Sequence, residues 1–455
     1  MEVMEDCSEE LQPYSLQFPL VPTSIIQDLL LKSLVLAGLG ALVLVNIRFH
    51  TFAPLLRLAG TQGIGAMLLR PSILWLAMGA GLLLFRTLLW LAYQPRSLAK
   101  FEDAPCMTVV VPAYNEGAMV AKAIDSLAGA NYPPERLEII VVDDGSTDDT
   151  WMHIQHAVAR HGDRIHAVRL ERNGGKREAL AVGFRRGTGE IFVTVDSDSV
   201  VDANALLALA GPFTSERVGV VAGRILVYNR REGIIPRMLH VRFALSFDFL
   251  RAYQSTFGTV YCSPGALSAY RASAVRTVLD RWLHQRFLGS RATIGEDRAL
   301  TNDIMRLGYD SIYQRTAMVL TVVPMTYGKL CRMFLRWDRS FIREELRFAS
   351  VVWKRPPLAR LIALLDVSIT NLRYPATCLT LVLMGTALFH DPLDLLRVLL
   401  SMGMASLIYS LYFLHSERSF DVVYGVLFSY FSFFSLFWIF PWALVTVRTR
   451  GWMTR

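Results

Sequence analysis

The chain has 455 residues, of which 53% are hydrophobic and 19% charged, with a formal net charge of +8. Soluble domains usually carry about 25% charged residues, so this composition excludes a wholly soluble enzyme as well as disordered, fibrous and disulfide-stapled chains. The charges are unevenly placed, because 59 of the 86 charged side chains fall in residues 101–350. We therefore expect a soluble domain between membrane segments.

The first part of the chain contains two apolar stretches, at residues 25–47 and 71–93. A helix that spans a membrane needs about 20 mostly apolar residues, so we predict two N-terminal transmembrane helices within residues 25–99. Residues 1–24 begin with an acidic run that lacks the positive charge of a signal peptide. They are predicted to form an acidic cytosolic tail.

The middle of the chain, residues 100–345, alternates short β-branched runs with helical patterns. Strands that alternate with helices form a mostly parallel, doubly wound sheet with helices on both faces. The expected fold class is therefore α/β. The strands are predicted at residues 108–112, 137–142, 166–170 and 191–195.

A polar loop follows each of these predicted strands, at residues 113–116, 143–146, 173–177 and 196–198. Asp and Gly after a strand are also ordinary turn and helix-cap residues, so one such loop has a purely structural explanation. Four loops at the carboxyl ends of strands, where ligands bind in such sheets, favour a nucleotide site. The sequence lacks the glycine motifs of dinucleotide-binding and P-loop proteins, which argues against both classes.

Asp196 and Asp198 form a D-x-D motif after the fourth predicted strand. Residues i and i+2 of a strand share a face, so we predict that the two carboxylates lie side by side. Carboxylate oxygens suit Mg²⁺ or Mn²⁺ shared with a diphosphate, and Lys176 and Arg177 can neutralise the same diphosphate. The pattern predicts displacement on a nucleotide-diphospho-sugar.

Apolar and amphipathic segments follow the predicted domain. We predict interfacial helices over residues 346–370, because arginine and lysine there mix with aromatic and aliphatic residues. C-terminal transmembrane helices are predicted over residues 371–455, where residues 422–447 form the longest uncharged stretch. Three polar residues of the predicted membrane part either snorkel at helix ends or line a polar path between helices: Arg86, Asn371 and Arg373.

Cysteine spacing and charge distribution indicate the surroundings of the chain. The five cysteines are far apart and form no C-x-x-C pair, which favours free thiols facing a reducing cytosol. The basic residues are spread through the domain and near membrane boundaries. Diphosphates and membrane lipids are therefore expected partners, and nucleic acid is not.

Four further motifs carry a resemblance to a known family. They are R-A-Y-Q-S-T-F-G at residues 251–258, C-S-P-G-A-L-S-A-Y-R at 262–271, G-E-D-R-A-L-T-N at 295–302 and R-W-D-R-S-F-I-R-E at 336–344. With these motifs the chain resembles inverting family-2 glycosyltransferases, in particular membrane-embedded hyaluronan synthases and nodulation chitooligosaccharide synthases. The resemblance implies a GT-A-type domain inserted between transmembrane helices.

The resemblance also implies roles for the residues that match its motifs. Asp297 is the expected general base for the acceptor hydroxyl, flanked by Glu296 and Arg298. Trp337 and Cys262 are expected at the acceptor sugar. Asp198 and Asp196 are the expected metal ligands. The UDP-binding residues would be Tyr114, Glu116, Asp144, Lys176, Arg177, Asp196 and Arg336.

The function implied is a processive inverting β-glycosyltransferase that polymerises UDP-GlcNAc and UDP-glucuronate into an extracellular polysaccharide such as hyaluronan and exports it through its own channel. The expected location is the plasma or inner membrane, with several spans and a cytosolic catalytic domain. Two departures from the family pattern, Met333 in place of glutamine and Leu250 in place of an acidic residue, keep two alternatives open. These are a chitin-type synthase that uses UDP-GlcNAc alone and, more distantly, a polyprenyl-phosphate glycosyltransferase.

Overall fold

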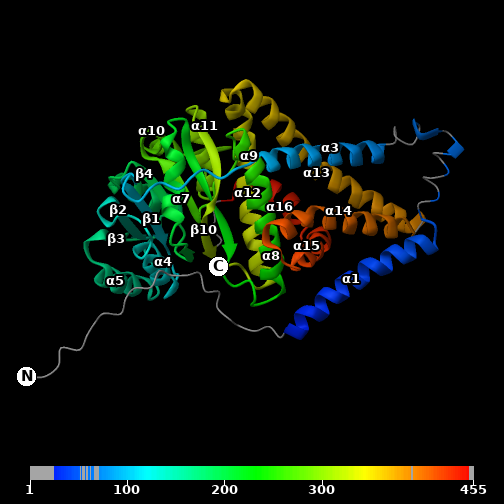
Figure 1. Cartoon of the computed structure of the whole chain (residues 1–455), viewed down its shortest axis with the longest axis horizontal. Coiled ribbons are helices and arrows are strands. Elements are labelled where there is room, and N and C mark those ends of the chain that lie inside the picture. The colour runs from blue at the N-terminus through cyan, green and yellow to red at the C-terminus, as the bar shows by residue number, and fades with distance from the viewer. Residues whose placement is uncertain are drawn as a thin grey trace, which may run out of the picture.

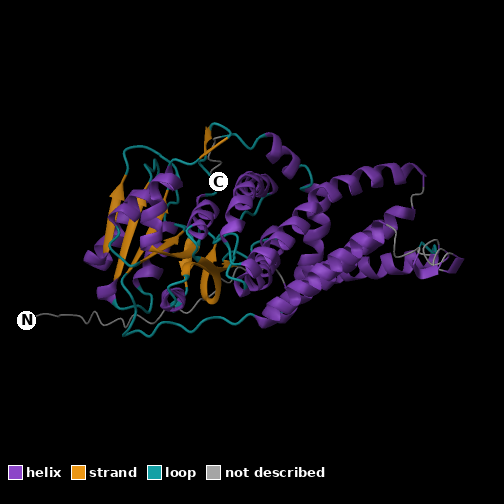
Figure 2. Ribbon diagram, turned by 90° about the horizontal axis from the view of Figure 1, so that it is seen from above, coloured by secondary structure: helices purple, strands orange, loops and turns teal. Residues whose placement is uncertain are grey.

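A computed structural model of the chain describes residues 25–51, 71–390 and 393–449, together with scattered residues between 53 and 65. A domain built around a β-sheet lies at one end, and long helices extend from it at the other (Figures 1 and 2). The predicted acidic tail, residues 1–24, lies outside the described residues.

The four predicted strands are present and parallel, in the order β3-β2-β1-β4. β1 and β4 are buried along their whole length, as expected for strands covered by helices on both faces. Their bounds are β1 Met107–Ala113, β2 Leu137–Asp143, β3 Ile165–Arg169 and β4 Ile191–Val195. The helices that connect them are α4 Met119–Ala128, α5 Thr150–His161 and α6 Lys176–Arg186.

The second half of the sheet is mixed. The full order is β3-β2-β1-β4-β7-β6-β10-β5; β7 runs antiparallel to both β4 and β6, β10 runs parallel to β6, and β5 runs antiparallel to β10. The prediction of a mostly parallel sheet is confirmed, but the antiparallel strands were not anticipated. The added strands are β5 Ser199–Val201, β6 Val218–Val227, β7 Leu267–Arg271 and β10 Asp310–Thr321, with a separate hairpin of β8 Arg286–Phe287 and β9 Ser290–Arg291.

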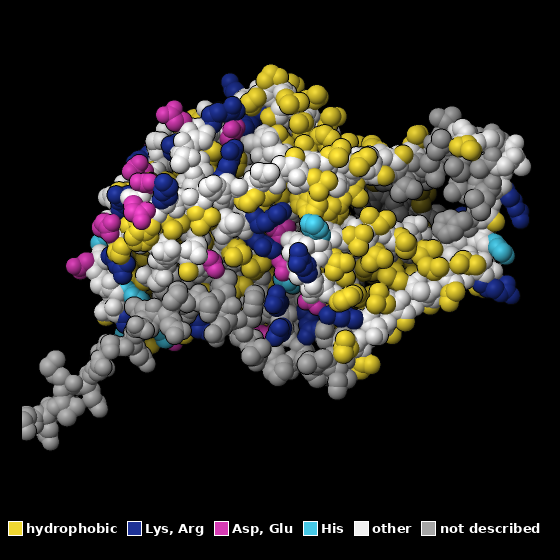
Figure 3. Space-filling model, viewed as in Figure 1, with side chains coloured by type: hydrophobic (Ala, Val, Ile, Leu, Met, Phe, Trp, Pro, Cys, Tyr) yellow, Lys and Arg dark blue, Asp and Glu magenta, His cyan; other side chains and the backbone are white. Residues whose placement is uncertain are grey.

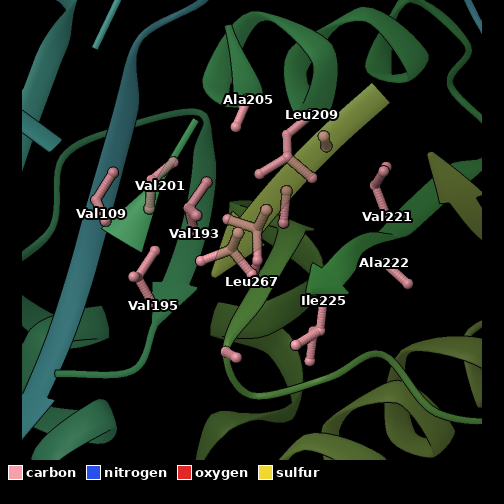
Figure 4. Packing of buried hydrophobic residues seen from close by; sticks show 14 of the residues in the cluster. Val109, Val193, Val195, Val201, Ala205, Leu209, Val221, Ala222, Ile225 and Leu267 are labelled. Carbon is pink, nitrogen blue, oxygen red and sulfur yellow. The ribbon is translucent and has the colours of Figure 1, made fainter. Parts of the chain in front are cut away.

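Two hydrophobic cores lie on the two faces of the sheet. Alternate residues of β1 divide between them, because successive side chains of a strand point to opposite faces. Val109 joins a core with β4, β6 and β7 residues such as Val193, Val221 and Leu267 (Figure 4). Val110 instead packs in a second core with Phe184 and other residues of α6 and α10. The sheet is thereby fixed between two helical layers.

The remaining helices of the domain lie around the mixed half of the sheet. α8 continues through a π-helical segment into α9, and α12 packs against both α11 and α16. Their bounds are α7 Ala205–Ala210, α8 Ile234–Ala244, the π-helical segment Leu245–Arg251, α9 Ala252–Thr256, α10 Ala272–Leu283, α11 Glu296–Arg306 and α12 Tyr327–Val351.

The apolar helices form the other end of the molecule. Hydrophobic side chains gather over them, whereas charged side chains gather over the sheet domain and at the boundary between the two parts (Figure 3). This matches the uneven charge distribution along the sequence. The helices are α1 Ile25–Arg48, α3 Pro71–Ala92, α13 Pro357–His390, α14 Leu393–Glu417, α15 Val422–Ser435 and α16 Ile439–Val445.

Within the described residues, two helical stretches are long and apolar enough to cross a membrane: Leu29–Arg48 and Leu395–Glu417. The uncharged stretch at residues 422–447 contains two helices, α15 and α16, which are bent by 50°. Pro441 lies in the first turn of α16, where its missing N–H leaves no hydrogen bond of the helix unmade. The bent pair counts as a third span only if both helices cross together.

Two of the four predicted domain boundaries fall inside helices. α12 runs through the boundary at residues 345/346, and α13, a helix of 34 residues, runs through the boundary at 370/371. The division of the chain into five parts therefore stays a prediction.

Candidate active site at the carboxyl edge of the sheet

Two loops at the edge of the parallel strands are fixed to each other by Asp144. Its two carboxylate oxygens accept hydrogen bonds from the backbone N–H groups of Gly174 and Gly175, at 2.8 and 2.7 Å. Burial raises the pKa of Asp144, although these N–H groups oppose the change. The contact sets the turn that precedes α6 and places Lys176 at the first position of that helix.

The loop after β1 is held in a similar way. The backbone N–H groups of Glu116 and Gly117 both donate to Thr150 Oγ1 at 2.8 Å, and the Asn115 N–H donates to Ser146 Oγ at 3.0 Å. Tyr114 is half-buried in this loop. The structure therefore brings the predicted uridine-binding residues of the first two loops to one edge of the sheet.

Lys176 lies between two carboxylates at this edge. Its ammonium group forms ion pairs with Asp196 and with Glu296, the latter at 3.3 Å. Burial disfavours the charged ammonium group, but the two carboxylates outweigh it and raise the pKa of Lys176. Lys176 is therefore held as a cation at the edge of the sheet where the sequence predicts a diphosphate.

The D-x-D residues lie in the turn after β4, which ends at Val195. The expectation that they share a strand face is therefore wrong, and they have different partners. Asp196 is paired with Lys176, whereas Asp198 accepts hydrogen bonds from Ser199 and Thr321 at 3.3 Å each. Both still lie in the turn that follows the carboxyl end of β4, and Asp196 is the one that contacts Lys176.

Asp297 lies in the first turn of α11, after Gly295, which has a left-handed φ of 70°. Its Oδ1 accepts a hydrogen bond from the Arg298 N–H at 2.7 Å, and its Oδ2 accepts one from the Gly265 N–H at 3.2 Å. The Cys262 thiol lies 4.0 Å from the same Oδ2. The structure thus places Cys262 beside the predicted base.

The two neighbouring carboxylates of this turn differ in proton affinity. Burial and the negative charge of Glu296 raise the pKa of Asp297 to about 6. Glu296 is also buried, but the ion pair with Lys176 outweighs burial and lowers its pKa. Pairs of carboxylates whose environments separate their pKa values are typical of acid–base sites. Asp297 is the member suited to accept a proton near neutral pH.

Arg177 is not brought to the predicted diphosphate site. Its guanidinium is buried, donates to Trp282 O at 2.6 Å and Gln285 Oε1 at 2.8 Å, and lies over the Trp282 ring. Adjacent residues of a helix point about 100° apart, so Lys176 and Arg177 cannot both face the same ligand. The expectation of two cations on the diphosphate is therefore not met by the geometry.

Arg298 also points away from the edge of the sheet. It is paired with Glu345 of α12, and its guanidinium lies 4.7 Å from the centre of the Phe341 ring. Arg298 therefore flanks Asp297 in sequence but contacts α12 with its side chain.

Trp337, the predicted acceptor residue, lies on α12. Trp337 is 37% exposed and has the Phe334 and Phe243 rings as neighbours, at centroid distances of 5.6 and 6.1 Å. Ser340, one helical turn further on, lies where a side chain on Gly295 would be. Trp337 is therefore about one turn from the contact between α12 and the turn that carries Asp297. The charge of Arg336 lowers the pKa of Glu296, which places Arg336 near the same turn.

Gly265 is a site residue that motif analysis did not single out. Its N–H binds Asp297, and a Cβ at this position would lie 2.7 Å from Lys176 Nζ. The signal was available, because Gly265 belongs to the C-S-P-G run at the start of the second family motif. Its contribution through a backbone N–H could not be read from residue type.

A Gly265→Ala substitution is expected to weaken donor binding with little loss of stability. The added methyl group displaces only the flexible end of Lys176, so the free energy of unfolding should change by less than about 1 kcal/mol. The loss of the Lys176–Asp196 geometry should raise the KM for the donor by about tenfold. Gly328→Ala, where nothing lies near an added Cβ, is the matched control for both measurements. An unchanged KM with wild-type stability would contradict this placement of Lys176.

Comparison with known proteins identifies the family. The family profile described as "Glycosyl transferase family 2" matches residues 108–279. An N-acetylglucosaminyltransferase of Azorhizobium caulinodans is 30% identical over 358 residues, which cover 77% of this chain and 87% of that protein. The chain therefore belongs to the family-2 glycosyltransferases.

Two other relatives match the chain over a shorter region. An N-acetylglucosaminyltransferase of Mesorhizobium japonicum is 34% identical over 246 residues, and a hyaluronan synthase of Streptococcus pyogenes is 35% identical over 258 residues. The matches cover 54% and 56% of this chain, and they span 58% and 61% of the lengths of the two relatives. The chain thus spans about three fifths of the length of these two relatives, and its described residues add apolar helices long enough to cross a membrane.

The fold is also found among solved structures. A mannosyltransferase from Pyrobaculum calidifontis, solved in complex with GDP-Man and Mn²⁺, superposes with a TM-score of 0.57 at 22% sequence identity. The match covers 78% of this chain and 96% of that structure. The predicted GT-A-type domain flanked by apolar helices is thereby confirmed.

Proposed function

We propose that the protein is a processive inverting β-glycosyltransferase that joins UDP-GlcNAc and UDP-glucuronate into a polysaccharide such as hyaluronan and exports it through its own membrane part. The observation that carries the proposal is Asp297 at the start of α11. A single residue links Asp297 to Lys176: the Gly265 N–H donates to Asp297, and a Cβ on Gly265 would lie 2.7 Å from Lys176 Nζ. The similarity to a protein named hyaluronan synthase supports the choice of polymer.

In the proposed reaction, Asp297 removes the proton from the acceptor hydroxyl as its oxygen attacks the anomeric carbon. The new C–O bond forms while the bond from that carbon to the diphosphate breaks, so UDP leaves and the configuration inverts. A base with a pKa of about 6 is mostly ionised at neutral pH and accepts the proton without a large penalty. Lys176 holds the departing diphosphate by its positive charge.

The residues around the D-x-D motif fit a divalent cation. Asp198 and Asp196 provide hard carboxylate oxygens, and the described residues contain no group of three His, Cys, Asp or Glu side chains that could hold an ion alone. This donor set suits Mg²⁺ or Mn²⁺, which proteins often bind through one or two carboxylates together with substrate phosphates. When bound, the ion would neutralise charge on the diphosphate.

The acceptor would lie on Trp337. Its partly exposed indole offers an apolar face for a sugar ring, and its position near the Asp297 turn supports an acceptor hydroxyl on the side of the base. A platform for a growing chain favours repeated transfer over a single transfer to a polyprenyl phosphate. The apolar helices beside α12 support export of the product through the membrane. Export is the only part of the proposal that depends on these helices.

A chitin-type synthase that uses UDP-GlcNAc alone is the second candidate. It is favoured by the two relatives named N-acetylglucosaminyltransferase. Met333, which replaces a hydrogen-bonding glutamine of the family pattern, leaves the choice of polymer open. Both candidates use the same base and the same diphosphate site. They differ only in which UDP-sugars are added to the acceptor end of the growing chain.

The decisive experiment supplies the purified membrane protein with each UDP-sugar singly and in pairs. Polymer that forms only when UDP-GlcNAc and UDP-glucuronate are both present, and that a hyaluronan-specific lyase degrades, supports the proposal. Polymer from UDP-GlcNAc alone, degraded by chitinase, establishes the second candidate instead. Transfer of one sugar to a polyprenyl phosphate would overturn both.

The predicted polar path is only partly supported by the contacts of its residues. Arg86 forms an ion pair with Asp366 of α13 at 2.6 Å, and Asn371 donates to Glu345 of α12 at 3.0 Å. Arg373 is exposed and donates to the neighbouring Tyr374 hydroxyl at 2.9 Å. Of the three, we therefore propose only Arg373 for the lining of a polar path. Arg86 instead connects α3 to α13 through its ion pair with Asp366.

An Arg86→Leu variant is expected to be strongly destabilised. It leaves the Asp366 carboxylate, which is only 2% exposed, without its counter-charge. Removing one partner of a buried ion pair costs about 3–5 kcal/mol, so thermal unfolding in detergent should shift well below that of the wild type. Arg373→Leu removes an exposed guanidinium from the same region and should cost less than about 1 kcal/mol. Equal stability of the two variants would refute the structural role of Arg86.

A further inference from the structure

A short stretch of α13 contacts the catalytic region on two sides of the helix. Asp366, Thr370 and Asn371 lie within about one and a half turns of each other on this helix. All three have polar partners outside α13, which is unusual for a helix in the apolar part of the molecule. The partners belong to segments that lead directly to Asp297.

The first connection runs through Asp366. Its carboxylate accepts hydrogen bonds from the Tyr261 and Tyr253 hydroxyls at 3.0 Å and is paired with Arg86. Tyr261 begins the short segment that contains Cys262 and Gly265, and Gly265 donates its N–H to Asp297. Asp366 therefore fixes one end of the segment that binds the base.

The second connection runs through Asn371. Its Nδ2 donates to Glu345 Oε1 at 3.0 Å, and the other oxygen of Glu345 pairs with Arg298. The backbone N–H of Arg298 donates to Asp297 at 2.7 Å. In the Arg298 side chain, Nε is buried without a hydrogen-bond partner, so the ion pair with Glu345 is the main contact that orients the guanidinium. Asn371 therefore supports the other side of the base.

We propose that Asp366 and Asn371 are positioning residues for glycosyl transfer. Through Tyr261 and Glu345, they hold the Gly265 segment and the first turn of α11 at a fixed distance, so that Asp297 is presented to an acceptor sugar and not to water. This inference rests on the proposed transferase function. It also links the orientation of α13 to the reaction, so that displacement of α13 alters the balance between transfer and hydrolysis of the donor.

A purely architectural role is the alternative, and the two roles can be separated. The Gly265 segment is also held directly to α11, because Ser263 Oγ lies 2.6 Å from Thr301 Oγ1. The segment therefore keeps its fold when the Tyr261 hydroxyl is removed. The Tyr261 ring itself packs edge-to-face on Phe348 at 5.0 Å, a contact that phenylalanine preserves.

The test compares Tyr261→Phe, Asn371→Ala and the double variant with Tyr253→Phe as the matched control. Tyr253→Phe removes a hydrogen bond from the same Asp366 carboxylate, but Tyr253 does not belong to the segment that binds Asp297. The full-length protein in lipid nanodiscs is assayed for sugar incorporated into polymer and for free sugar released by water. The KM for the donor and the thermal midpoint are measured on the same preparations.

Each single variant is expected to lower the ratio of transfer to hydrolysis by about 3- to 10-fold, as expected for the loss of one orienting hydrogen bond, with the donor KM unchanged within twofold. Tyr253→Phe should leave the ratio at the wild-type value. Equal ratios in Tyr261→Phe and Tyr253→Phe, or an Asn371→Ala variant changed only in its thermal midpoint, would overturn the proposal. If the wild type incorporates no sugar from any donor, the proposed function fails, whereas wild-type transfer with unchanged variant ratios refutes only the positioning role.

Discussion

Asp297→Asn should reduce kcat for polymer synthesis by about 10²–10⁴-fold, because an amide cannot accept the proton of the acceptor hydroxyl. Asparagine has nearly the same size and can still accept the Gly265 N–H, so the site should keep its shape. The KM for the donor and the binding of UDP should stay near wild-type values. Initial rates of sugar incorporation over a range of donor concentrations measure both quantities.

The control for this substitution is Asp280→Asn. Asp280 is an exposed aspartate whose side chain is 87% accessible and whose ion-pair partner is Arg185. It should retain wild-type kcat and KM. Polymer synthesis by Asp297→Asn at the wild-type rate would mean that another group accepts the proton, and the proposed mechanism would fail.

Lys176→Met is the second substitution with a large expected effect. Lys176 lowers the pKa of Asp297 and of Glu296, so its removal should raise the pKa of both carboxylates. The acid limb of the kcat–pH profile, expected near pH 6 in the wild type, should move to higher pH. Because the variant also loses the cation that faces the diphosphate, kcat/KM at neutral pH should fall by about 10²-fold or more.

Lys122→Met provides the comparison, since Lys122 is an exposed lysine on α4. Its pH profile should coincide with that of the wild type. The direction of the shift is the informative result, because a variant that is merely unstable loses activity without moving the acid limb. A limb that stays in place or moves to lower pH in Lys176→Met would contradict the electrostatic coupling between Lys176 and Asp297.

The parallel half of the sheet could be predicted from sequence because its strands are buried on both faces. Such strands appear as uninterrupted β-branched runs, as in residues 108–112 and 191–195. The mixed half could not be predicted in this way. β6 and β10 include charged residues such as Arg224 and Arg315, which pair with Asp248 inside the fold, so their apolar pattern is broken in the sequence.

The sequence predicted the candidate site where its chemistry depends on the type of residue. It did not predict the site where the chemistry depends on the direction in which a side chain points. Lys176, Asp297 and Cys262 are brought together as the motifs indicated, whereas Arg177 points into the second core. Lys176 and Arg177 are neighbours in the sequence. Their side chains point in different directions only because α6 begins at Lys176. Gly265 was missed because its contribution is a backbone N–H.

The contact of α16 with α12 affects the timing of biosynthesis. The two helices pack against each other, and Arg339 of α12 donates to Thr446, the C-cap residue of α16, at 2.9 Å. The ribosome completes α16 about 90 residues after α12, which corresponds to roughly 5–20 seconds at ordinary elongation rates. The helix that carries Trp337 therefore gains its last support only after the apolar helices have been made. Under the proposed function, a nascent chain would begin to polymerise sugar only once its apolar helices have been made.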